Sequence, residues 1–381
     1  MTPARDQELT ELCSIHKLSA GREALDLATA LADRSEDPLI VALAKAEETH
    51  RARNLGLQQR AVVAGAELLA AVERLGDLGS LVGSDDERLV TGRVLLEMGM
   101  SKACCAALDV PEVSLAAIDA LIDAYTRVLG ELGYRDLAAV RLRARRHFVS
   151  GDDARVAAIV EGLVPHVNFT NGHRERFGCP GCVLASFAWY LGPEADPALL
   201  DELLAPVFEG HRDFPNEAPE VRRWLHTGVD TYCANAQSCH LFYGRAHLWR
   251  GHLEVAEEHT PQIRHFDLDD SFLLPTIYFL ELAMASGDGD RIRARVDLLR
   301  PRVEPHEDVD EAMVAALRIA QALALLGDDD RDGEQAGLWR FAERCAERLD
   351  ARLERPRHAA RVARERAEGA PFLAALARRA R

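Results

Sequence analysis

The residues of this chain that are best suited to chemistry are two pairs of cysteines. Cys179 and Cys182 form a C-x-x-C pair in the segment RFGCPGCVLASFAWYLG, directly before an apolar helical pattern. Cys233 and Cys239 form a second pair about 50 residues later, and His240 follows it directly. Thiolates and imidazole nitrogens are the usual ligands of structural Zn²⁺, and a C-x-x-C pair supplies two of the four ligands from one turn of the chain.

These pairs predict a structural zinc site that joins two irregular segments. Four protein ligands would complete the coordination sphere, so the metal would stabilise the fold and take no part in a reaction. The predicted ligands are Cys179, Cys182, Cys233 and Cys239, with His240 and His173 as substitutes. The spacing leaves open whether the two cysteine pairs lie close enough to share one metal ion. Cys179 and Cys239 each begin a helical pattern and are 60 residues apart, about two short repeats.

Two other interpretations of Cys179 and Cys182 stay open. A thiol at a helix N-terminus has a lowered pKa, and Cys-Pro-Gly-Cys is similar to the thioredoxin active-site turn with Pro and Gly exchanged. That chemistry requires a strand before the motif, and no strand pattern precedes it here. Alternatively, the thiols are unliganded and buried, which is also the interpretation for the cysteines inside apolar helical patterns: Cys13, Cys104, Cys105 and Cys345.

The segments that would position these residues have an almost continuous helical periodicity. Apolar residues recur three or four positions apart over 22–34, 63–77, 115–134 and 136–152, and no segment alternates like a half-buried strand. Ala, Leu, Arg and Glu dominate the composition, and all four favour helices. Because the breaks between the patterns are short, the sequence predicts an all-α fold of antiparallel helical hairpins.

One segment of the chain matches another. VSGDDARVAAIVEGLVPHV (149–167) aligns without a gap to ASGDGDRIRARVDLLRPRV (285–303), with nine of 19 positions identical and an offset of 136, four times 34. In each copy Gly would end one helix, Asp would cap the next, and Pro would stop it. The repeated unit is therefore helix, tight turn, helix and stop, which must stack on its neighbours to bury its apolar face.

A unit of 34 residues resembles the tetratricopeptide-repeat (TPR) superfamily in a divergent form. The family's Trp, Leu-Gly and Tyr positions in the first helix are mostly missing, although AWYLG (188–192) is similar to them. The resemblance implies a TPR-like α-solenoid, a right-handed superhelical stack of antiparallel helical hairpins. It further implies a concave face that binds a protein or peptide partner, and it implies no catalytic residue.

The same patterns suggest three regions. Divergent helical hairpins are expected over 1–130 and TPR-like repeats over 131–350, with an irregular cysteine-containing insert at 166–182 and 208–240. An Arg-rich capping helix or tail is expected over 351–381, where nine Arg face three Glu. The last region could instead contact an acidic partner or the acidic body of the chain.

Charge and motifs narrow the function classes. The net charge of −16 disfavours nucleic acid as a partner. Neither a secretory signal nor a membrane-spanning apolar run is evident, so we expect a cytoplasmic protein with reduced thiols. Phosphate-loop, dinucleotide-binding and nucleophile-elbow motifs are missing from the sequence.

The sequence thus predicts a non-catalytic scaffold or adaptor that binds a protein or peptide, with zinc as a possible structural cofactor. The alternative is a thiol- or metal-dependent enzyme on a helical scaffold that uses Cys179 and Cys182. Whether the chain is an enzyme stays open at this stage.

Overall fold

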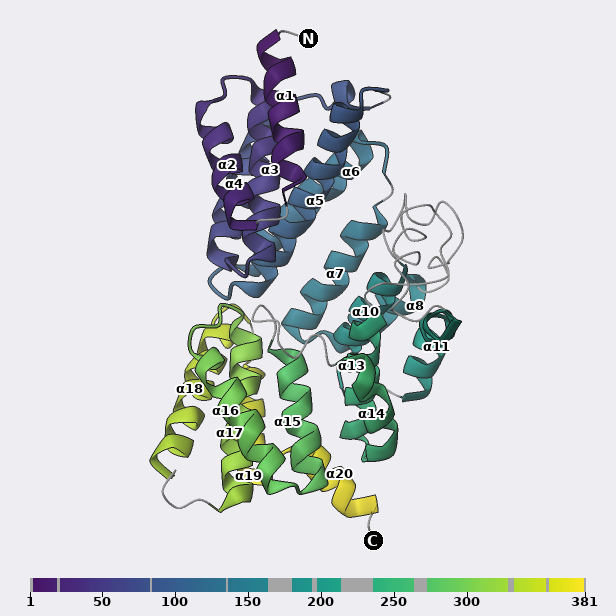
Figure 1. Ribbon diagram of the computed structural model, residues 1–381, viewed down its shortest axis with the longest axis vertical. Helices are drawn as coiled ribbons and strands as arrows, with labels where there is room; N and C mark the ends of the chain where they lie inside the picture. The colour runs from purple at the N-terminus through teal and green to yellow at the C-terminus, as the bar shows by residue number, and fades with distance from the viewer. Residues whose placement is uncertain are drawn as a thin grey trace. The chain divides into compact units, whose positions relative to one another are not determined.

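The computed structural model is all-α, as the periodicity predicted. It describes residues 3–18, 21–82, 84–134, 136–163, 180–193, 197–213, 236–263, 273–327, 332–353 and 356–379. Over these ranges the chain forms 18 α-helices and two 3₁₀ turns, and no strand (Figure 1). No helix in the described ranges is long and apolar enough to cross a membrane. The chain divides into two compact units, Met1–Arg146 and His147–Arg381.

The first unit is built around α3. Its helices are α1 (Pro3–His16), α2 (Gly21–Arg34), α3 (Pro38–Asn54), α4 (Gln58–Leu75), α5 (Glu87–Asp109), α6 (Leu115–Glu131) and the start of α7 (Leu137–Ser150), with the turn η1 (Gly79–Leu81). Helix α3 packs against α1, α2, α4 and α5, and most of its side chains are buried. It begins where Asp37 accepts hydrogen bonds from the amides of Leu39 and Ile40, with Pro38 in the first turn.

Two glycines let the helices of the first unit approach closely. A Cβ atom added at Gly99 of α5 would lie 2.6 Å from the Cα and Cβ atoms of Ala46 on α3. One added at Gly65 of α4 would lie 2.6 Å from the Cβ atom of Ala103 on α5. Any larger side chain at either position would force the helices apart. Helix α5 is therefore held tightly against both α3 and α4.

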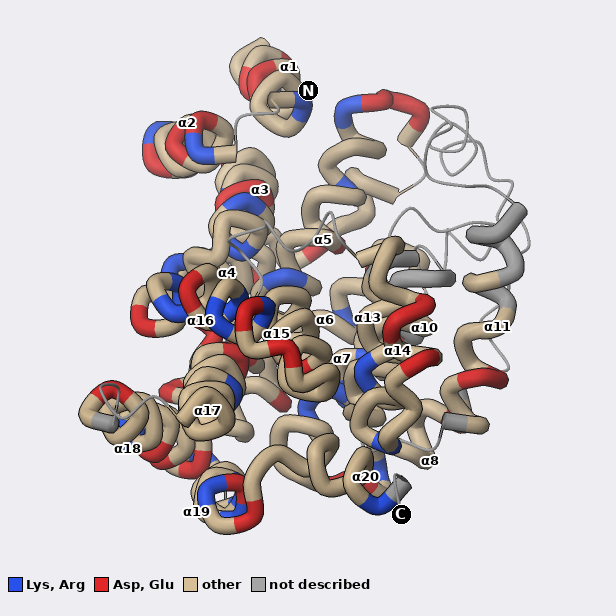
Figure 2. The backbone as a smooth tube through the Cα atoms, turned by 60° about the horizontal axis from the view of Figure 1, so that its bottom comes forward, with Lys and Arg blue, Asp and Glu red and all other residues tan. Residues whose placement is uncertain are grey.

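The second unit is a succession of helices that pack on their neighbours in the sequence. They are α8 (Asp153–Leu163), α10 (Pro180–Leu191), α11 (Pro197–Asp213), α13 (Ala236–Trp249), α14 (Leu253–His259), η3 (Thr260–Gln262), α15 (Leu274–Ser286), α16 (Gly289–Val303), α17 (Val309–Leu326), α18 (Asp332–Asp350), α19 (His358–Glu368) and α20 (Pro371–Arg379). From α13 to α19 each helix contacts the next, and the alternate helices α13, α15, α17 and α19 also contact one another in series (Figure 2). Helix α20 packs back against α13 and α15.

The turn chemistry predicted from the matching segments is confirmed. Gly287 ends α15 with a left-handed φ of 70°, and the Asp288 carboxylate accepts from the amides of Asp290 and Arg291 at the start of α16. Gly151 has the same left-handed conformation, with a φ of 74°, after α7. The tight Gly-Asp turn is therefore a shared local structure.

The predicted helix stop at Pro301 is wrong. Pro301 lies inside α16, which continues to Val303. Proline removes one amide donor from the last turn, but the residues after it keep theirs, so the helix loses a hydrogen bond without ending there. The matching Pro165 lies outside the described residues.

The predicted regions 1–130, 131–350 and 351–381 stay predictions about repeats. The two compact units of the structure divide between Arg146 and His147, within α7. Most of the predicted insert lies outside the described residues.

Candidate functional site

Of the predicted zinc ligands, the structure describes the side chains of Cys239 and His240. Cys239 lies one turn into α13 and is fully buried. The predicted ligands outside the described side chains are Cys179, Cys182, Cys233 and His173. Among the described residues, no group of three or more His, Cys, Asp and Glu side chains is placed to hold a metal ion. The four-cysteine site therefore stays a prediction.

His240 belongs to a cluster of imidazole and aromatic rings. Its Nδ1 atom lies 2.7 Å from Nδ1 of His259, so one of the two rings donates to the other. The ring of Phe208 lies 4.7 Å from that of His240, and Tyr243 lies 4.7 Å from His259. Burial, strengthened by the nearby His247, lowers the pKa of His259 to about 4. His259 is therefore neutral at physiological pH, and its ring packs among the rings of His240, Tyr243 and Phe208.

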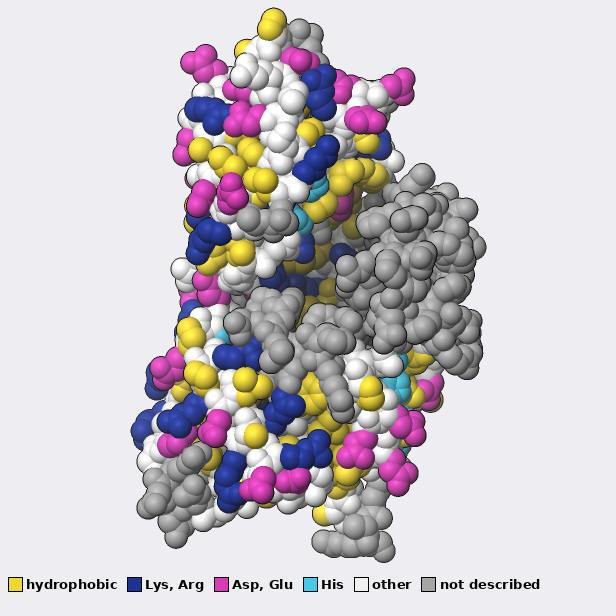
Figure 3. All heavy atoms as spheres, in the orientation of Figure 1, with side chains coloured by type: hydrophobic (Ala, Val, Ile, Leu, Met, Phe, Trp, Pro, Cys, Tyr) yellow, Lys and Arg dark blue, Asp and Glu magenta, His cyan; other side chains and the backbone are white. Residues whose placement is uncertain are grey.

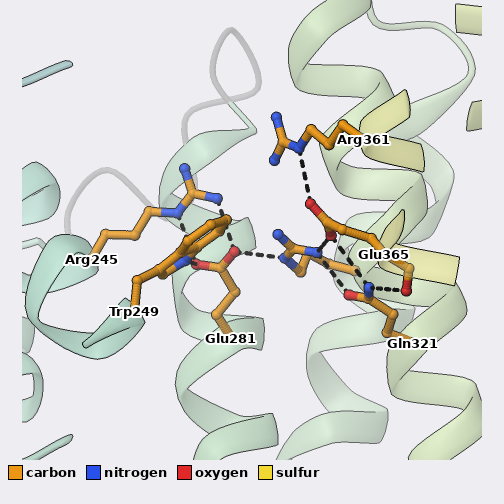
Figure 4. A network of polar contacts seen from close by, with 7 residues as sticks. Arg245, Trp249, Glu281, Gln321, Arg361 and Glu365 are labelled. Atoms are coloured by element: carbon orange, nitrogen blue, oxygen red, sulfur yellow. Dashed lines mark hydrogen bonds and ion pairs between the residues drawn. The ribbon is translucent and has the colours of Figure 1, made fainter. Parts of the chain in front are cut away.

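The most ordered polar arrangement in the second unit is a charge ladder across the alternate helices (Figure 4). Arg245 of α13 forms two hydrogen bonds of 2.8 Å with Glu281 of α15. Glu281 also accepts from Nε of Arg318 of α17 at 2.7 Å, and Arg318 in turn contacts Glu365 of α19. Arg361 ends the series with a 2.9 Å hydrogen bond to Glu365. Cations and carboxylates thus alternate from α13 to α19.

The charge ladder is deeply buried. Glu281 and Arg318 have 0% exposed area, and Glu365 has 1%. Burial alone would raise the pKa of Glu281, but Arg245 and Arg318 outweigh it and lower that pKa to about 2. Glu365 has a pKa of about 2 for the same reason, because Arg318 and Arg361 outweigh its burial. Each carboxylate is therefore ionised and flanked by two guanidinium groups.

Two further side chains complete the ladder. Gln321 accepts from Nη1 of Arg318 at 2.7 Å and donates to Glu365 at 3.3 Å. The indole of Trp249 donates to Glu281 at 3.4 Å, and the Arg318 guanidinium lies 5.4 Å from its ring centroid. The Nη2 atom of Arg318 is the ladder's exception, since it is buried with no hydrogen-bond partner among the described residues.

Helix α20 covers this part of the unit. The chain turns at Gly369, which has a φ of 80°, and α20 then packs against α13 and α15. Phe372 at its start is 0% exposed, and its ring centroid lies 5.8 Å from the Arg318 guanidinium. Leu373 and Leu376 pack at the edge of the same apolar core. The amphipathic helix α20 therefore covers part of the surface of α13 and α15.

Sequence reasoning missed the charge ladder, although a pattern for it exists. Glu281 is the one charged residue in the apolar helix LPTIYFLELAMAS, and Arg318 is the one basic residue in VDEAMVAALRIAQALALL. A lone charge within an apolar helix needs a buried partner. The sequence could have indicated that partners exist, but not that Glu281 and Arg318 contact one another.

The described residues on the face seen in Figure 3 show no comparable order. Acidic and basic side chains are interspersed on this face, with apolar side chains between them. Such mixed surfaces are ordinary for proteins in water. The site candidates therefore lie among the packed helices.

Comparison with known proteins assigns no family and no function to the chain. The fold and the side-chain chemistry alone carry the functional argument. No protein-family model, no curated protein and no solved structure matches the chain.

Proposed function

We propose that the chain is a TPR-like α-solenoid whose second unit binds a helical peptide segment of a partner protein. In helical repeats, each hairpin contacts only its neighbours, so the first helices of successive hairpins line one continuous surface. The serial contacts of α13, α15, α17 and α19 support this arrangement. The Gly-Asp turn between α15 and α16 supports the hairpin unit.

The observation that carries the proposal is α20 itself. This nine-residue helix lies on α13 and α15, far from them in sequence, and inserts Phe372 beside the charge ladder. A surface that holds such a helix within the chain has the shape and the apolar anchor site to hold one from a partner. The expected partner segment is a short amphipathic helix with a leading aromatic residue and Leu one and four positions later, as in PFLAALARR.

A truncated chain that ends at Gly369 tests this function. Without α20 the surface should bind a fluorescent peptide of residues 370–381, measured by anisotropy, whereas the full chain should bind it much more weakly because α20 competes. The control peptide carries Phe372→Ala and should lose most of its affinity, since the buried anchor is removed.

Failure of the truncated chain to fold would leave the surface unformed, so a second variant is needed. Phe372→Ala in the full chain weakens α20 without removing it, and it should admit the wild-type peptide. A folded Phe372→Ala chain that binds wild-type and control peptides equally would contradict the proposal.

The structural zinc ion and the thiol-enzyme alternative stay proposals about Cys179 and Cys182. About one equivalent of zinc in the purified chain, lost in a Cys179→Ser variant together with a fall in Tm, would support the structural site. A metal-free chain with one easily oxidised thiol pair would favour the redox alternative.

A further inference from the structure

A second polar cluster lies in the first unit, where α3 and α5 run alongside each other. The helices meet most closely at Ala46 and Gly99, and they are tied again by an ion pair of 2.6 Å between Arg53 and Asp109. His50 lies one turn beyond Ala46 on α3, and Lys102 lies one turn beyond Gly99 on α5. Residues three or four apart share a helix face. His50 and Lys102 therefore lie near one another between the close crossing and the ion pair, and Lys102 acts electrostatically on His50.

Three hydrogen-bond donors in this space lack partners. None of the described residues forms an ion pair or hydrogen bond with the Lys102 ammonium. The Nε atom of Arg53 and the Nδ1 atom of His50 are buried and have no hydrogen-bond partner among the described residues. His50 accepts from Asn54 through Nε2 at 3.0 Å, so its neutral ring carries the proton on Nδ1.

Three guanidinium groups act electrostatically on the Lys102 ammonium. Arg145 of α7 pairs with Asp109, which already pairs with Arg53, so a single carboxylate is shared by two guanidinium groups. Arg141 lies one turn before Arg145 and, with Arg53 and Arg145, acts electrostatically on Lys102. Burial lowers the pKa of Lys102, and these three guanidinium groups lower it further, although Cys105 acts in the opposite direction.

Lys45 of the same unit is a lysine whose ammonium is paired with carboxylates. Its ammonium lies 2.9 Å from Glu48 and 2.7 Å from Glu67. Burial would lower the pKa of Lys45, but hydrogen bonds to Glu67 and Glu48 raise it. Lys102 has the same chemistry and is also partly buried, but it has no carboxylate partner among the described residues. What it lacks is an anion.

We propose that His50, Arg53 and Lys102, with Arg141 and Arg145 around them, form a binding site for a phosphate group. Unpaired buried donors are costly, and those that persist in native proteins usually mark an ion, a water or a ligand. A phosphate has several acceptor oxygens and can bind an ammonium, a guanidinium and an imidazole at once. Its negative charge would also be attracted by the Lys102 ammonium. The ligand is inorganic phosphate or a small phosphomonoester, since both present the same group.

Calorimetric titration of the full chain with inorganic phosphate, in a low-salt buffer free of other oxyanions, tests the site. We expect saturable binding with one phosphate per chain, weakened about tenfold or more in Lys102→Met. Lys102→Arg keeps the charge and should retain binding. Lys45→Met is the matched control and should bind like the wild type. Equal affinities in Lys102→Met and the wild type would overturn the proposal.

The choice of anion separates the possible ligands. Glycerol phosphate that binds as tightly as inorganic phosphate would assign the site to phosphomonoesters, and markedly weaker binding would assign it to the free ion. Acetate and chloride at equal ionic strength should bind much more weakly. If they bind as well as phosphate, the cluster is only screened by salt and the proposal fails.

Amine labelling gives a second readout that does not depend on a variant. The chain has three lysines, Lys17, Lys45 and Lys102, so acylation can be followed at each by peptide mass spectrometry. Phosphate should slow acylation of Lys102 and leave the rates at Lys17 and Lys45 unchanged. Uniform protection of all three, or none, would contradict a site at Lys102.

Discussion

The charge ladder of the second unit and the cation cluster of the first (His50, Arg53, Lys102, Arg141 and Arg145, with Asp109) solve the burial of charge in opposite ways. In the ladder, each carboxylate lies between two guanidinium groups. In the cluster, two guanidinium groups share the carboxylate of Asp109, and Lys102 has none. The carboxylates of the ladder are paired within the chain, whereas Lys102 of the cluster is left for an external anion to pair.

The difference teaches that burial of charge alone does not identify a ligand site. Arg318 is more deeply buried than Lys102, yet its neighbours Glu281 and Glu365 hold it in the charged form. A buried network in which each carboxylate lies between two cations holds helices in register. A cluster with unpaired donors has free energy left to gain from a ligand. Whether each buried charge has an opposite charge beside it therefore distinguishes a structural network from a ligand-binding cluster.

The largest expected effect comes from breaking the ladder at its centre. Arg318→Met would leave Glu281 and Glu365 buried beside one cation each, and we expect the free energy of unfolding to fall by about 3–5 kcal/mol. Urea unfolding followed by tryptophan fluorescence measures it, because all four tryptophans, Trp189, Trp224, Trp249 and Trp339, belong to the second unit.

Arg293→Met is the control for the ladder. Arg293 forms an exposed pair of 3.1 Å with Asp290 on the same helix, where exposed ion pairs contribute little. Its unfolding midpoint should stay close to that of the wild type. Equal losses in Arg293→Met and Arg318→Met would show that the ladder has no special role in stability.

The next effect comes from forcing α3 and α5 apart. In Gly99→Ala the new Cβ would lie 2.6 Å from the Cα atom of Ala46 and 2.8 Å from its carbonyl oxygen. Overpacking of this kind costs about 1–3 kcal/mol. Phosphate binding should weaken at the same time, because His50 and Lys102 would separate. Thermal unfolding by far-UV circular dichroism and phosphate calorimetry measure the two effects.

Gly130→Ala provides the contrast in the same unit. Gly130 lies in α6 with open space around the new Cβ, so alanine should leave stability unchanged or raise it slightly. Phosphate affinity should not change. A variant of Gly99 that behaves like the variant of Gly130 would argue against the close crossing of α3 and α5.

A smaller effect distinguishes the two partly buried lysines, Lys45 and Lys102. Lys102→Met removes an unpaired cation and should stabilise the first unit by about 1 kcal/mol in the absence of phosphate. Lys45→Met leaves Glu48 and Glu67 without their shared cation and should destabilise it by about 1 kcal/mol. Thermal unfolding of the two variants in phosphate-free buffer measures the difference, and shifts of the same sign would contradict it.

The smallest effect is a dependence on pH. Burial lowers the pKa of His50 to about 4, with Glu47 opposing and Lys102 reinforcing the shift. The folded state therefore favours the neutral ring, so its contribution is complete above pH 6.5 and is lost as pH falls towards 4. His50→Gln should reduce the loss of stability between pH 7 and pH 5 by up to about 1 kcal/mol.

The stabilisation by the charge ladder should depend on pH in a more acidic range than that of His50. Because the pKa values of Glu281 and Glu365 are about 2 in the folded chain, the stabilisation by both carboxylates is complete above about pH 4.5 and is lost as pH falls towards 2. Urea unfolding at a series of pH values distinguishes the two windows. A ladder that weakens between pH 7 and pH 5 in step with His50 would contradict the assignment.

The sequence by itself determined the helical class and the local turns. Apolar periodicity over 22–34 and 115–134 predicted two helices, which the structure places at Gly21–Arg34 and Leu115–Glu131. The Gly-Asp turn at Gly287 also followed from local chemistry, because a left-handed cap and an N-cap depend on neighbouring residues alone. The prediction of a helix end at Pro301 was wrong, because proline removes only one hydrogen bond there and α16 continues to Val303.

Only the tertiary structure decided which charges are partnered. Glu281 and Arg318 are 37 residues apart, and Arg53 and Asp109 are 56 apart. Their pairing depends on which helices lie side by side, and an ion pair has no sequence periodicity that would reveal it. The same packing left Lys102 without a carboxylate beside the close crossing at Gly99. Residue types are a property of the sequence, but the balance of charge around a buried group exists only once the helices have packed.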